Sequence, residues 1–549
     1  FLFIHPIFRL FMFSPKYWPL SFIKSLLATR SAGLISIVLA VVSKCLIAWI
    51  YSNLEGDKSL YLLFAESFRQ SGLLYEPISF IEDGAARRLY NPAVHSPLYS
   101  LLAMPLLWLT SSYYVTQLLL SFFGWALFFT ALYKVAAFVF GRPWVTNLFI
   151  LCTAFYLYPH ELDAGPKDTL SAAFTLWSIY FGYRFIQFPQ RFSTTVLLAV
   201  SISCVCLTKL IYAPLLGVFI LTLLVWLIQK RSKRHWLGFA YLLLLLAGTA
   251  ISLDYFILLP CKQLPPFRAS AATHDGTLVI RGFYPVNLLS TYPFISSSFI
   301  NTNFWSVQLE KMLQVPFSKI MIGFRAMDVL LFGVLSAVLI GYIKKPVRKI
   351  IWLIMATAAT LAGVVFYLSL TYQSFSYKSA TGLWTFVKDA RSFFVPVIAL
   401  QMALFLFVFK WGGPPIIRTA LFLLFLFECF HGIYFTLKQT VNASQIIGIN
   451  KVNSPAKKVV AHLAMLKEKE SDCRLVTTDN SLRRLAVING HMAYSFSGQP
   501  SSLSWMEKGS ALLIATHVQD STVLKIFPPQ KVRFADTVQP FVLYYYRAE

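Results

Sequence analysis

Two acidic residues, Glu55 and Asp57, follow directly after the first long apolar stretch of the sequence, in the run Glu55-Gly-Asp57. An ionised carboxylate costs free energy near hydrocarbon and is usually kept there for chemistry or substrate contact. A carboxylate in this position can act as a general base that takes a proton from an incoming hydroxyl. Asp57 can equally cap the helix that follows it, because the helix dipole favours negative charge at that end. The sequence leaves both roles open.

The composition places these acids in a membrane protein. Of the 549 residues, 57% are hydrophobic, 16% are aromatic and only 13% are charged, and the mean hydropathy is +0.63. Apolar stretches near 20 residues, long enough to cross a bilayer as helices, recur about eleven times. The sequence therefore predicts a polytopic α-helical membrane domain over residues 1–440.

The last part of the chain, residues 441–549, has a different pattern. Polar and apolar residues alternate in short runs, at residues 474–478 and 542–546 among others, and these runs predict strands of a small α/β domain outside the bilayer. The seven cysteines do not form a disulfide framework. Five lie in apolar stretches, so Cys261 and Cys473 are the only pair expected to be exposed.

Short basic loops alternate along the chain with acidic or long ones. Because Lys and Arg in short loops are retained on the cytoplasmic side, the clusters at 230–234 and 344–349 are predicted to be cytoplasmic. The loop at residues 52–112 and the C-terminal domain are then extracytoplasmic, most simply at a bacterial inner or plasma membrane. This topology also explains the net charge of +25, so a nucleic-acid partner is not expected.

The first outer loop is about 60 residues long, too long for a passive connector. After Asp57, Leu60, Tyr61, Phe64 and Phe68 recur at helical spacing, which predicts an amphipathic helix lying on the membrane surface. A stretch that begins Asn91-Pro and ends Ser-Pro-Leu-Tyr99 leads into a short apolar segment that ends near Thr110. This segment predicts a second interfacial or re-entrant helix.

This order of elements resembles the C-type glycosyltransferase superfold, which includes aminoarabinose transferases, protein mannosyltransferases and related transferases of lipid-linked sugars. The segment from Tyr158 to Asp168 and the run Asp389-Ala-Arg391-Ser-Phe-Phe-Val-Pro396 are similar to that family's second acidic site and to its Arg-aromatic entry into a late helix. The sequence has no Trp-Trp-Asp-Tyr-Gly segment, which argues against an oligosaccharyltransferase catalytic subunit. It also lacks the charged His-Phe motif of protein mannosyltransferases after Asp57.

The resemblance implies transfer of a sugar from a polyprenyl-phosphate carrier to a glycan, lipid or protein acceptor at the outer membrane face. Such a reaction needs a base, cations for the departing phosphate and a groove for the isoprenoid. Asp57 is the candidate base. Glu161, Asp163 and Asp168 are candidates for the second acid, and Asp168 is preferred because it lies at the mouth of a helix.

Phosphate recognition favours arginine, whose planar guanidinium binds two oxygens at once. The candidates for substrate binding are Arg391, Lys388 and Lys378 on one outer connection and, in the first outer loop, Arg87, Arg88, His95 and Tyr99. His95 or His160 could join neighbouring acids at a divalent metal, but no dense ligand cluster is visible and the metal stays unknown.

Other function classes stay open. A polysaccharide polymerase, or a flippase or transporter of lipid-linked glycans, would also be a helical bundle with outer loops. Lys44, Lys134 and Asp254, within or near apolar stretches, fit that alternative. A non-catalytic assembly protein that docks through its C-terminal domain is a third class.

Overall fold

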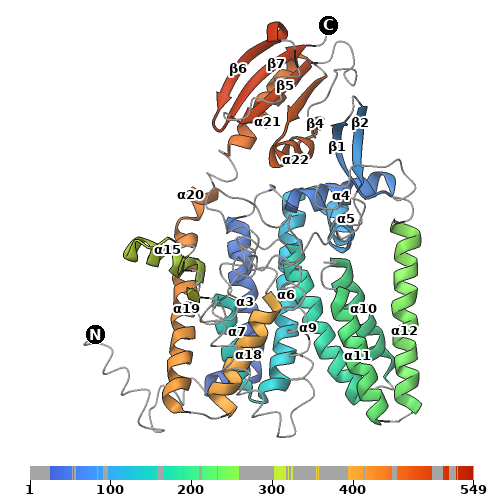
Figure 1. Cartoon of the computed structure of the whole chain (residues 1–549), viewed down its shortest axis with the longest axis vertical. Helices are drawn as coiled ribbons and strands as arrows, with labels where there is room; N and C mark the ends of the chain where they lie inside the picture. The colour runs from blue at the N-terminus through green and yellow to red at the C-terminus, as the bar shows by residue number, and fades with distance from the viewer. Residues whose placement is uncertain are drawn as a thin grey trace.

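The computed structural model describes residues 25–51, 54, 57–82, 85–90, 97–156, 166–188, 191–208, 213–230, 233–258, 302–316, 319–320, 323–324, 354, 357, 394–411, 414–447, 454–470, 472–496, 511–517, 527 and 529–547. Figure 1 shows a bundle of long helices below a β-sheet, with two shorter helices, α4 and α5, between them. Most of the described helices precede residue 441 and five of the seven described strands follow it, while the domain division at residues 440 and 441 stays a prediction.

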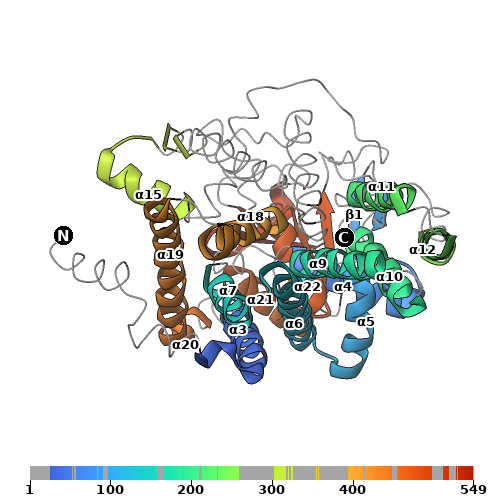
Figure 2. The same ribbon diagram turned by 90° about the horizontal axis from the view of Figure 1, so that it is seen from below.

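The helices of the bundle are mostly apolar along their whole length. Their bounds are α3 (Arg30–Ile50), α6 (Tyr113–Phe140), α7 (Pro143–Tyr156), α9 (Pro166–Gln187), α10 (Phe192–Thr208), α11 (Ala213–Lys230), α12 (Lys233–Leu253) with the π-turn η2 (Asp254–Leu258), α15 (Thr302–Leu313), α18 (Phe394–Leu406) with η7 (Phe407–Trp411), α19 (Pro415–Val441) and α20 (Ala443–Ile447). Seen from below, α3, α6, α7, α9 and α18 lie close together, while α15 and α19 stand at one side (Figure 2).

Four helices in the described ranges are long and apolar enough to cross a membrane: Ser31–Ile50, Tyr113–Phe140, Lys233–Phe256 and Pro415–Val441. Several shorter apolar helices, such as Pro143–Tyr156 and Phe192–Thr208, stand beside them. The protein is thus an integral membrane protein. The expected total of about eleven spans includes segments outside the described residues and stays a prediction.

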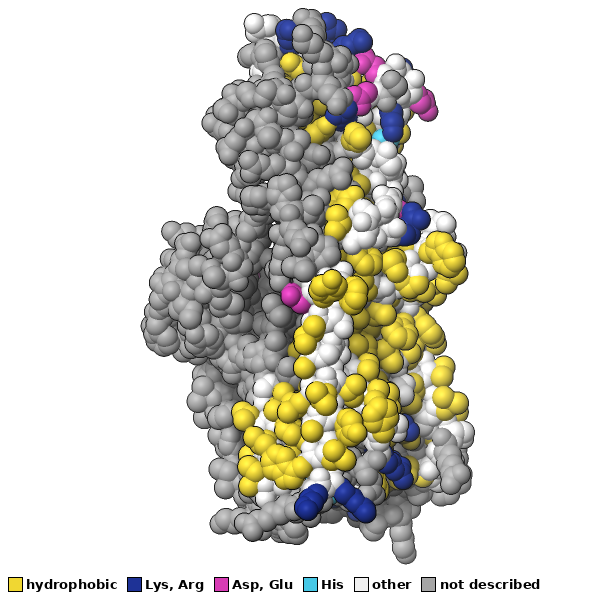
Figure 3. All heavy atoms as spheres, turned by 90° about the vertical axis from the view of Figure 1, so that its right-hand side faces the viewer, with side chains coloured by type: hydrophobic (Ala, Val, Ile, Leu, Met, Phe, Trp, Pro, Cys, Tyr) yellow, Lys and Arg dark blue, Asp and Glu magenta, His cyan; other side chains and the backbone are white. Residues whose placement is uncertain are grey.

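The bundle core is aromatic and aliphatic, and α6 runs through its centre. Phe128, Phe129, Leu132 and Val135 of this helix have no solvent exposure. At steps of one, three and three residues these side chains share one face of α6, and α6 packs against α9 and α3. One side of the molecule shows hydrophobic side chains over much of the bundle and Lys or Arg side chains gathered at its lower end (Figure 3).

Basic residues mark the end of the bundle opposite the sheet. Lys233 and Arg234, at the start of α12, are exposed there. Lys410 Nζ lies 3.5 Å from the carbonyl oxygens of Val139 and Phe140, the last residues of α6. A cation at a helix C-terminus interacts favourably with the dipole of that helix. Lys410, in η7, therefore also stabilises the C-terminal end of α6.

Two short helices form a layer between the bundle and the sheet. They are α4 (Asp57–Ser71) and α5 (Leu98–Thr110). The predicted apolar face of α4 is confirmed, because Leu60, Tyr61 and Phe64 are at most 7% exposed. Leu62 and Leu63 are buried as well, and α22 (Asn480–Ile488) of the C-terminal part contacts the same helix. α4 is thus enclosed by protein on more than one side, which a helix resting on the membrane surface would not be.

The predicted break after Thr110 is also confirmed. α5 ends at Thr110 and α6 begins at Tyr113. Ser112 caps α6, because its hydroxyl accepts a hydrogen bond of 3.3 Å from the backbone N–H of Val115.

The sheet has seven strands in the order β2-β1-β4-β3-β5-β7-β6. Its elements are β1 (Tyr75–Glu82), β2 (Ala85–Tyr90), α21 (Pro455–Lys469), β3 (Cys473–Thr477), α22 (Asn480–Ile488), β4 (Ala493–Phe496), β5 (Ala511–His517), the 3-10 turn η10 (Pro529–Lys531), β6 (Val532–Val538) and β7 (Phe541–Arg547). The four central strands β1, β4, β3 and β5 are parallel, and β2, β7 and β6 are antiparallel to their neighbours. The strands predicted near 474–478 and 542–546 are β3 and β7.

The β1–β2 hairpin belongs to the first outer loop, yet it extends the C-terminal sheet. Ser79, Phe80 and Ile81 pair with Tyr494, Ser495 and Phe496 of β4. The hairpin follows α4 directly, so α4 is connected to the sheet through the backbone as well as through α22.

One cysteine prediction is wrong. Cys473, expected to be exposed, is the first residue of β3 and only 3% exposed, in the core between the sheet and helices α21 and α22. Burial raises the pKa of its thiol to about 11, so it is a poor nucleophile at neutral pH. Cys261 lies outside the described residues.

Candidate functional site

The first turns of α4 and α9 meet at the sheet end of the bundle. The ammonium of Lys167, the second residue of α9, donates a hydrogen bond of 3.2 Å to the hydroxyl of Tyr61 on α4. The same ammonium lies 4.7 Å from the centre of the Tyr61 ring. A cation within about 6 Å of an aromatic face is attracted by the ring quadrupole. Tyr61 is one helical turn after Asp57, the first residue of α4.

Tyr61 is held in place by α5. The ring of Tyr99 packs edge-on against it with centroids 5.5 Å apart. The hydroxyl of Ser100 donates a hydrogen bond of 2.9 Å to the backbone carbonyl of Tyr61. Tyr99 and Ser100 are buried, so α5 positions α4 from below rather than facing solvent. The observed partner of Tyr99 is Tyr61, and contact of Tyr99 with a substrate stays a prediction.

Asp168 stands beside Lys167 in the first turn of α9, as the sequence predicts. Pro166 begins the helix, a position where its fixed backbone angle suits helical geometry. The hydroxyl of Ser171 donates a hydrogen bond of 2.9 Å to the backbone carbonyl oxygen of Asp168. Residues 167 and 168 are each only 9% exposed. An ionisable pair this buried, at the end of a membrane helix, is expensive to maintain, so these two residues are candidates for a functional site.

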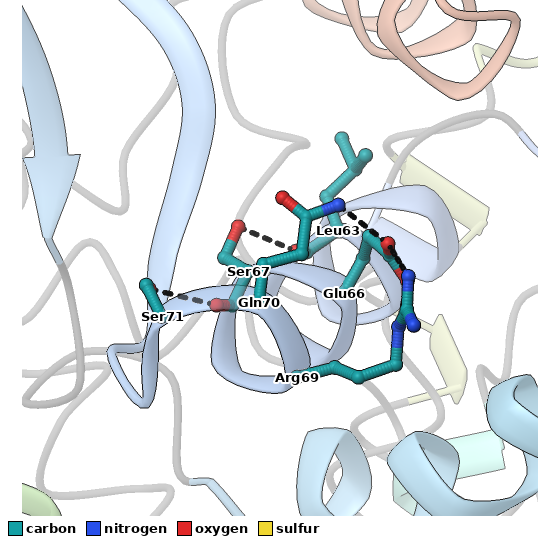
Figure 4. Close-up of polar contacts among 6 residues, drawn as sticks. All are labelled: Leu63, Glu66, Ser67, Arg69, Gln70 and Ser71. Carbon is teal, nitrogen blue, oxygen red and sulfur yellow. Dashed lines mark hydrogen bonds and ion pairs between the residues drawn. The ribbon is translucent and has the colours of Figure 1, made fainter.

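The opposite end of α4 carries an ordinary surface ion pair. The guanidinium of Arg69 contacts Glu66 through Nη2 to Oε1 at 2.5 Å and Nε to Oε2 at 3.0 Å, and the amide of Gln70 donates to Oε1 at 2.6 Å (Figure 4). These hydrogen bonds from Arg69 hold the pKa of the Glu66 carboxyl below its usual value. The side chain of Arg69 is 43% exposed. In the same turns, Ser67 and Ser71 donate to the carbonyls of Leu63 and Ser67.

The remaining predicted site residues are described only in part. Asp57 is placed as the first residue of α4, and Arg87 and Arg88 are placed in β2, opposite Phe80 and Ser79 of β1. The other candidates lie outside the described residues: Glu161, Asp163, His95, His160, Lys378, Lys388 and Arg391. The structure therefore joins α4 to the first turn of α9 through Tyr61 and Lys167, while the convergence of the acids and of the other cations stays a prediction.

Two features of the site were not predicted from the sequence. From the sequence, Lys167 was not included among the candidate site residues. The pattern that could have identified it is a cation next to an acid, Asp168, at the start of a helix. Tyr61 was expected only as part of an apolar face, yet its hydroxyl accepts the hydrogen bond of Lys167. Within the described ranges, no group of three or more His, Cys, Asp or Glu side chains could hold a metal ion. The divalent metal therefore stays a prediction.

Comparisons with known proteins give a likeness in overall fold. No family model matches the sequence, and no curated protein matches it. The crystal structure of ArnT from Cupriavidus metallidurans bound to undecaprenyl phosphate is similar, with 12% identity, a TM-score of 0.47, and coverage of 94% of this chain and 98% of that chain. The apo structure of the same protein is similar with 13% identity, a TM-score of 0.45 and the same coverage. Neither likeness relates individual residues of the two proteins.

Proposed function

We propose that the protein is an integral membrane glycosyltransferase. It moves a sugar from a polyprenyl-phosphate carrier to a glycan, lipid or protein acceptor of the cell envelope. The observation that carries this proposal is the contact of buried Lys167 with Tyr61, one turn after Asp57 on α4, next to the equally buried Asp168 on α9. It supplies, in one place, the two kinds of group that the reaction requires.

The roles follow from charge. The acceptor hydroxyl gives its proton to a carboxylate, Asp57 or Asp168, as its oxygen bonds to the anomeric carbon of the donor sugar. The bond between that carbon and the phosphate oxygen breaks, and its electron pair goes to the phosphate. We assign to Lys167 the role of the fixed cation that stabilises the departing phosphate, because a preorganised charge of this kind contributes most at a site that excludes water.

The positions of the basic residues support the proposed orientation. Lys233, Arg234 and Lys410 lie at the end of the bundle opposite the sheet, where the positive-inside rule puts the cytoplasm. In this orientation the sheet, α4 and the start of α9 are extracytoplasmic. A lipid-linked sugar presented at the outer face would then meet Lys167.

A transfer assay in proteoliposomes tests the proposal. The full-length protein would be supplied with undecaprenyl-phosphate sugars and envelope lipids, and release of undecaprenyl phosphate would be followed together with the glycosylated product. If Asp168 is the general base, Asp168→Asn should lower turnover by about 10²-fold to 10⁴-fold. Asp536→Asn is the matched control, because Asp536 is a carboxylate on β6 whose side chain is 54% exposed. Equal turnover in the two variants would remove Asp168 from the mechanism.

A flippase or transporter of lipid-linked glycans is the second candidate, and one observation favours it. Glu428 lies in the middle of α19 and is 1% exposed. Its carboxylate accepts a hydrogen bond of 2.6 Å from the indole N–H of Trp305 and lies 3.6 Å from His431 Nδ1. Intramembrane ionisable residues often mark transport pathways. A transporter would move the lipid-linked glycan between leaflets without breaking its phosphate bond, and Glu428→Gln rather than Asp168→Asn would stop it.

A further inference from the structure

β3 and β5 are neighbouring parallel strands of the sheet. The chain that follows each of them continues to strands on opposite sides of this pair. After β3 the chain passes through α22 to β4, which pairs with β3 on one side. After β5 it continues to β6 and β7, which lie on the other side. In open α/β sheets, ligands bind outside the carboxyl ends of the strands at such a switch point.

An Asp–His pair occupies this position. Asp479 is the second residue after β3, and His517 is the last residue of β5. His517 Nε2 lies 3.2 Å from Asp479 Oδ2. The other carboxylate oxygen, Oδ1, accepts a hydrogen bond of 2.7 Å from the backbone N–H of Leu482 and so caps α22. The ring of His517 also packs against Phe541, with centroids 4.8 Å apart.

These contacts decide which nitrogen of His517 can receive a ligand. An ionised carboxylate only accepts hydrogen bonds, so Nε2 carries the hydrogen that it shares with Asp479. In the neutral ring, Nδ1 is then a hydrogen-bond acceptor with a lone pair. The His517 side chain is 42% exposed and that of Asp479 is 23% exposed. The pair is thus a rigid acceptor presented at an accessible edge.

The carboxyl ends of β3 and β5 face the bundle. β7 ends at the side of the sheet farthest from the bundle, near the chain end marked in Figure 1, and β5 runs antiparallel to it. α22 begins three residues after β3 and packs on α4. Arg483 and Arg484 in its first turns are 5% and 9% exposed. Asp479 and His517 are therefore on the edge of the sheet that is turned toward the layer containing Tyr61 and Lys167.

We propose that this edge, with His517 held by Asp479, is a second binding site, and that it takes a hydroxyl-rich, sugar-like ligand. Sugar hydroxyls are suitable donors to Nδ1. Across the described ranges no third His, Cys, Asp or Glu joins this pair, which is fewer ligands than a stable metal site needs. If the proposed glycosyltransferase function holds, on which this further role rests, the ligand is the acceptor glycan, held above the donor site.

Histidine footprinting tests the site without a donor lipid. The full-length protein in nanodiscs would be treated with diethylpyrocarbonate alone and with methyl glycosides of glucose, mannose, galactose and arabinose. Modification would be measured at each histidine by mass spectrometry. At least one glycoside should slow modification of His517 by about 2-fold to 10-fold, the occupancy effect expected of a weak polar site. His462 is the internal control, because it also neighbours a carboxylate, Asp536 at 3.9 Å, but lies on α21 beside β6.

Variants separate ligand binding from folding. Saturation-transfer NMR should show glycoside binding lost in His517→Ala and retained in His462→Ala. Asp479→Asn still caps α22, since Asn caps nearly as well as Asp. Its amide can donate to Nε2, however, which turns Nδ1 into a donor. We expect binding to weaken by about 2-fold to 10-fold in this variant.

Unchanged footprints with every glycoside, or normal binding by His517→Ala, would overturn the second site. This result is independent of the transfer assay. If proteoliposomes transfer no sugar, the proposed function fails while the footprint still decides the sugar site. If sugar is transferred and the footprint does not change, only the second site fails.

Discussion

Charged groups lie at the two ends of α4 in opposite settings. At the N-terminal end, Lys167 of α9 is 9% exposed and its ammonium lies over the ring of Tyr61, next in sequence to the equally buried Asp168. Toward the C-terminal end, Glu66 pairs with Arg69, whose side chain is 43% exposed. Surface pairs contribute about 0–1 kcal/mol, whereas a buried charge left alone costs several kcal/mol. Under the proposed function, the buried charges of α9 beside the first turns of α4 serve the reaction, while the pair in the last turns of α4 does not.

The strongest test of this contrast compares the two carboxylates of α4 itself. Asp57→Asn should lower sugar transfer by about 10²-fold to 10⁴-fold if Asp57 is the general base. The stability of the protein should change by less than about 1 kcal/mol, because Asn caps a helix nearly as well as Asp. Glu66→Gln removes the charge at the other end of the same helix and should leave transfer intact.

Near-normal transfer by a well-folded Asp57→Asn protein would make Asp57 a helix cap. The general base would then be Asp168 or one of the acids at 161 and 163. Thermal unfolding of both variants, measured in the same detergent, shows whether folding accounts for any loss.

The second test removes the buried cation. Lys167→Met keeps the length and most of the volume of the side chain, while it removes the charge beside the departing phosphate. We expect kcat/KM for the lipid-linked donor to fall by about 10²-fold to 10³-fold, as for other preorganised electrostatic groups. Arg69→Met is the matched control on the exposed end of α4. If the two substitutions lower kcat/KM equally, the buried and the exposed cation do not differ in their importance for transfer.

The third test concerns the link between α4 and α9. Tyr61→Phe retains the ring over which Lys167 lies but removes the hydroxyl that accepts its hydrogen bond. A hydrogen bond to a charged group contributes about 1.5–3 kcal/mol. We expect a loss of about 10-fold in kcat/KM, smaller than for Lys167→Met, with the increase mainly in KM for the donor. A fall in kcat alone would instead place Tyr61 in the chemical step.

The elements of this site were largely predictable because their signals are local. Helical spacing of apolar residues after Asp57 predicted α4, and the serines after Thr110 predicted the break before α6. Asp168 at a helix mouth was also predicted. Each of these inferences depends on side chains within about two helical turns of one another.

The features that were missed depend on contacts distant in sequence. β1 pairs with β4, more than 400 residues further along the chain, and neither strand indicates its partner. Cys473 is buried because α21 and α22 cover that face of the sheet, whereas alternation alone does not say which face is covered. Glu428 is a single acid in an apolar run, and its partner Trp305 comes from a helix more than 100 residues earlier. The pairing of Lys167 with Tyr61 is of the same kind.

The smallest expected effect is the pH dependence of the exposed end of α4. Hydrogen bonds from Arg69 lower the pKa of Glu66 in the folded protein. A carboxyl whose pKa is lower when folded stabilises the fold above its ordinary pKa, near 4.5, and loses that contribution as the pH falls through the folded value. Unfolding of the wild type and of Glu66→Gln, compared from neutral pH to pH 3, should therefore differ by less than about 1 kcal/mol at neutral pH and converge in acid. The difference should also shrink in high salt, because exposed charges are screened. A large or salt-insensitive difference would mean that Glu66 is as strongly coupled to the structure as Asp168, and the contrast between the two ends of α4 would then fail.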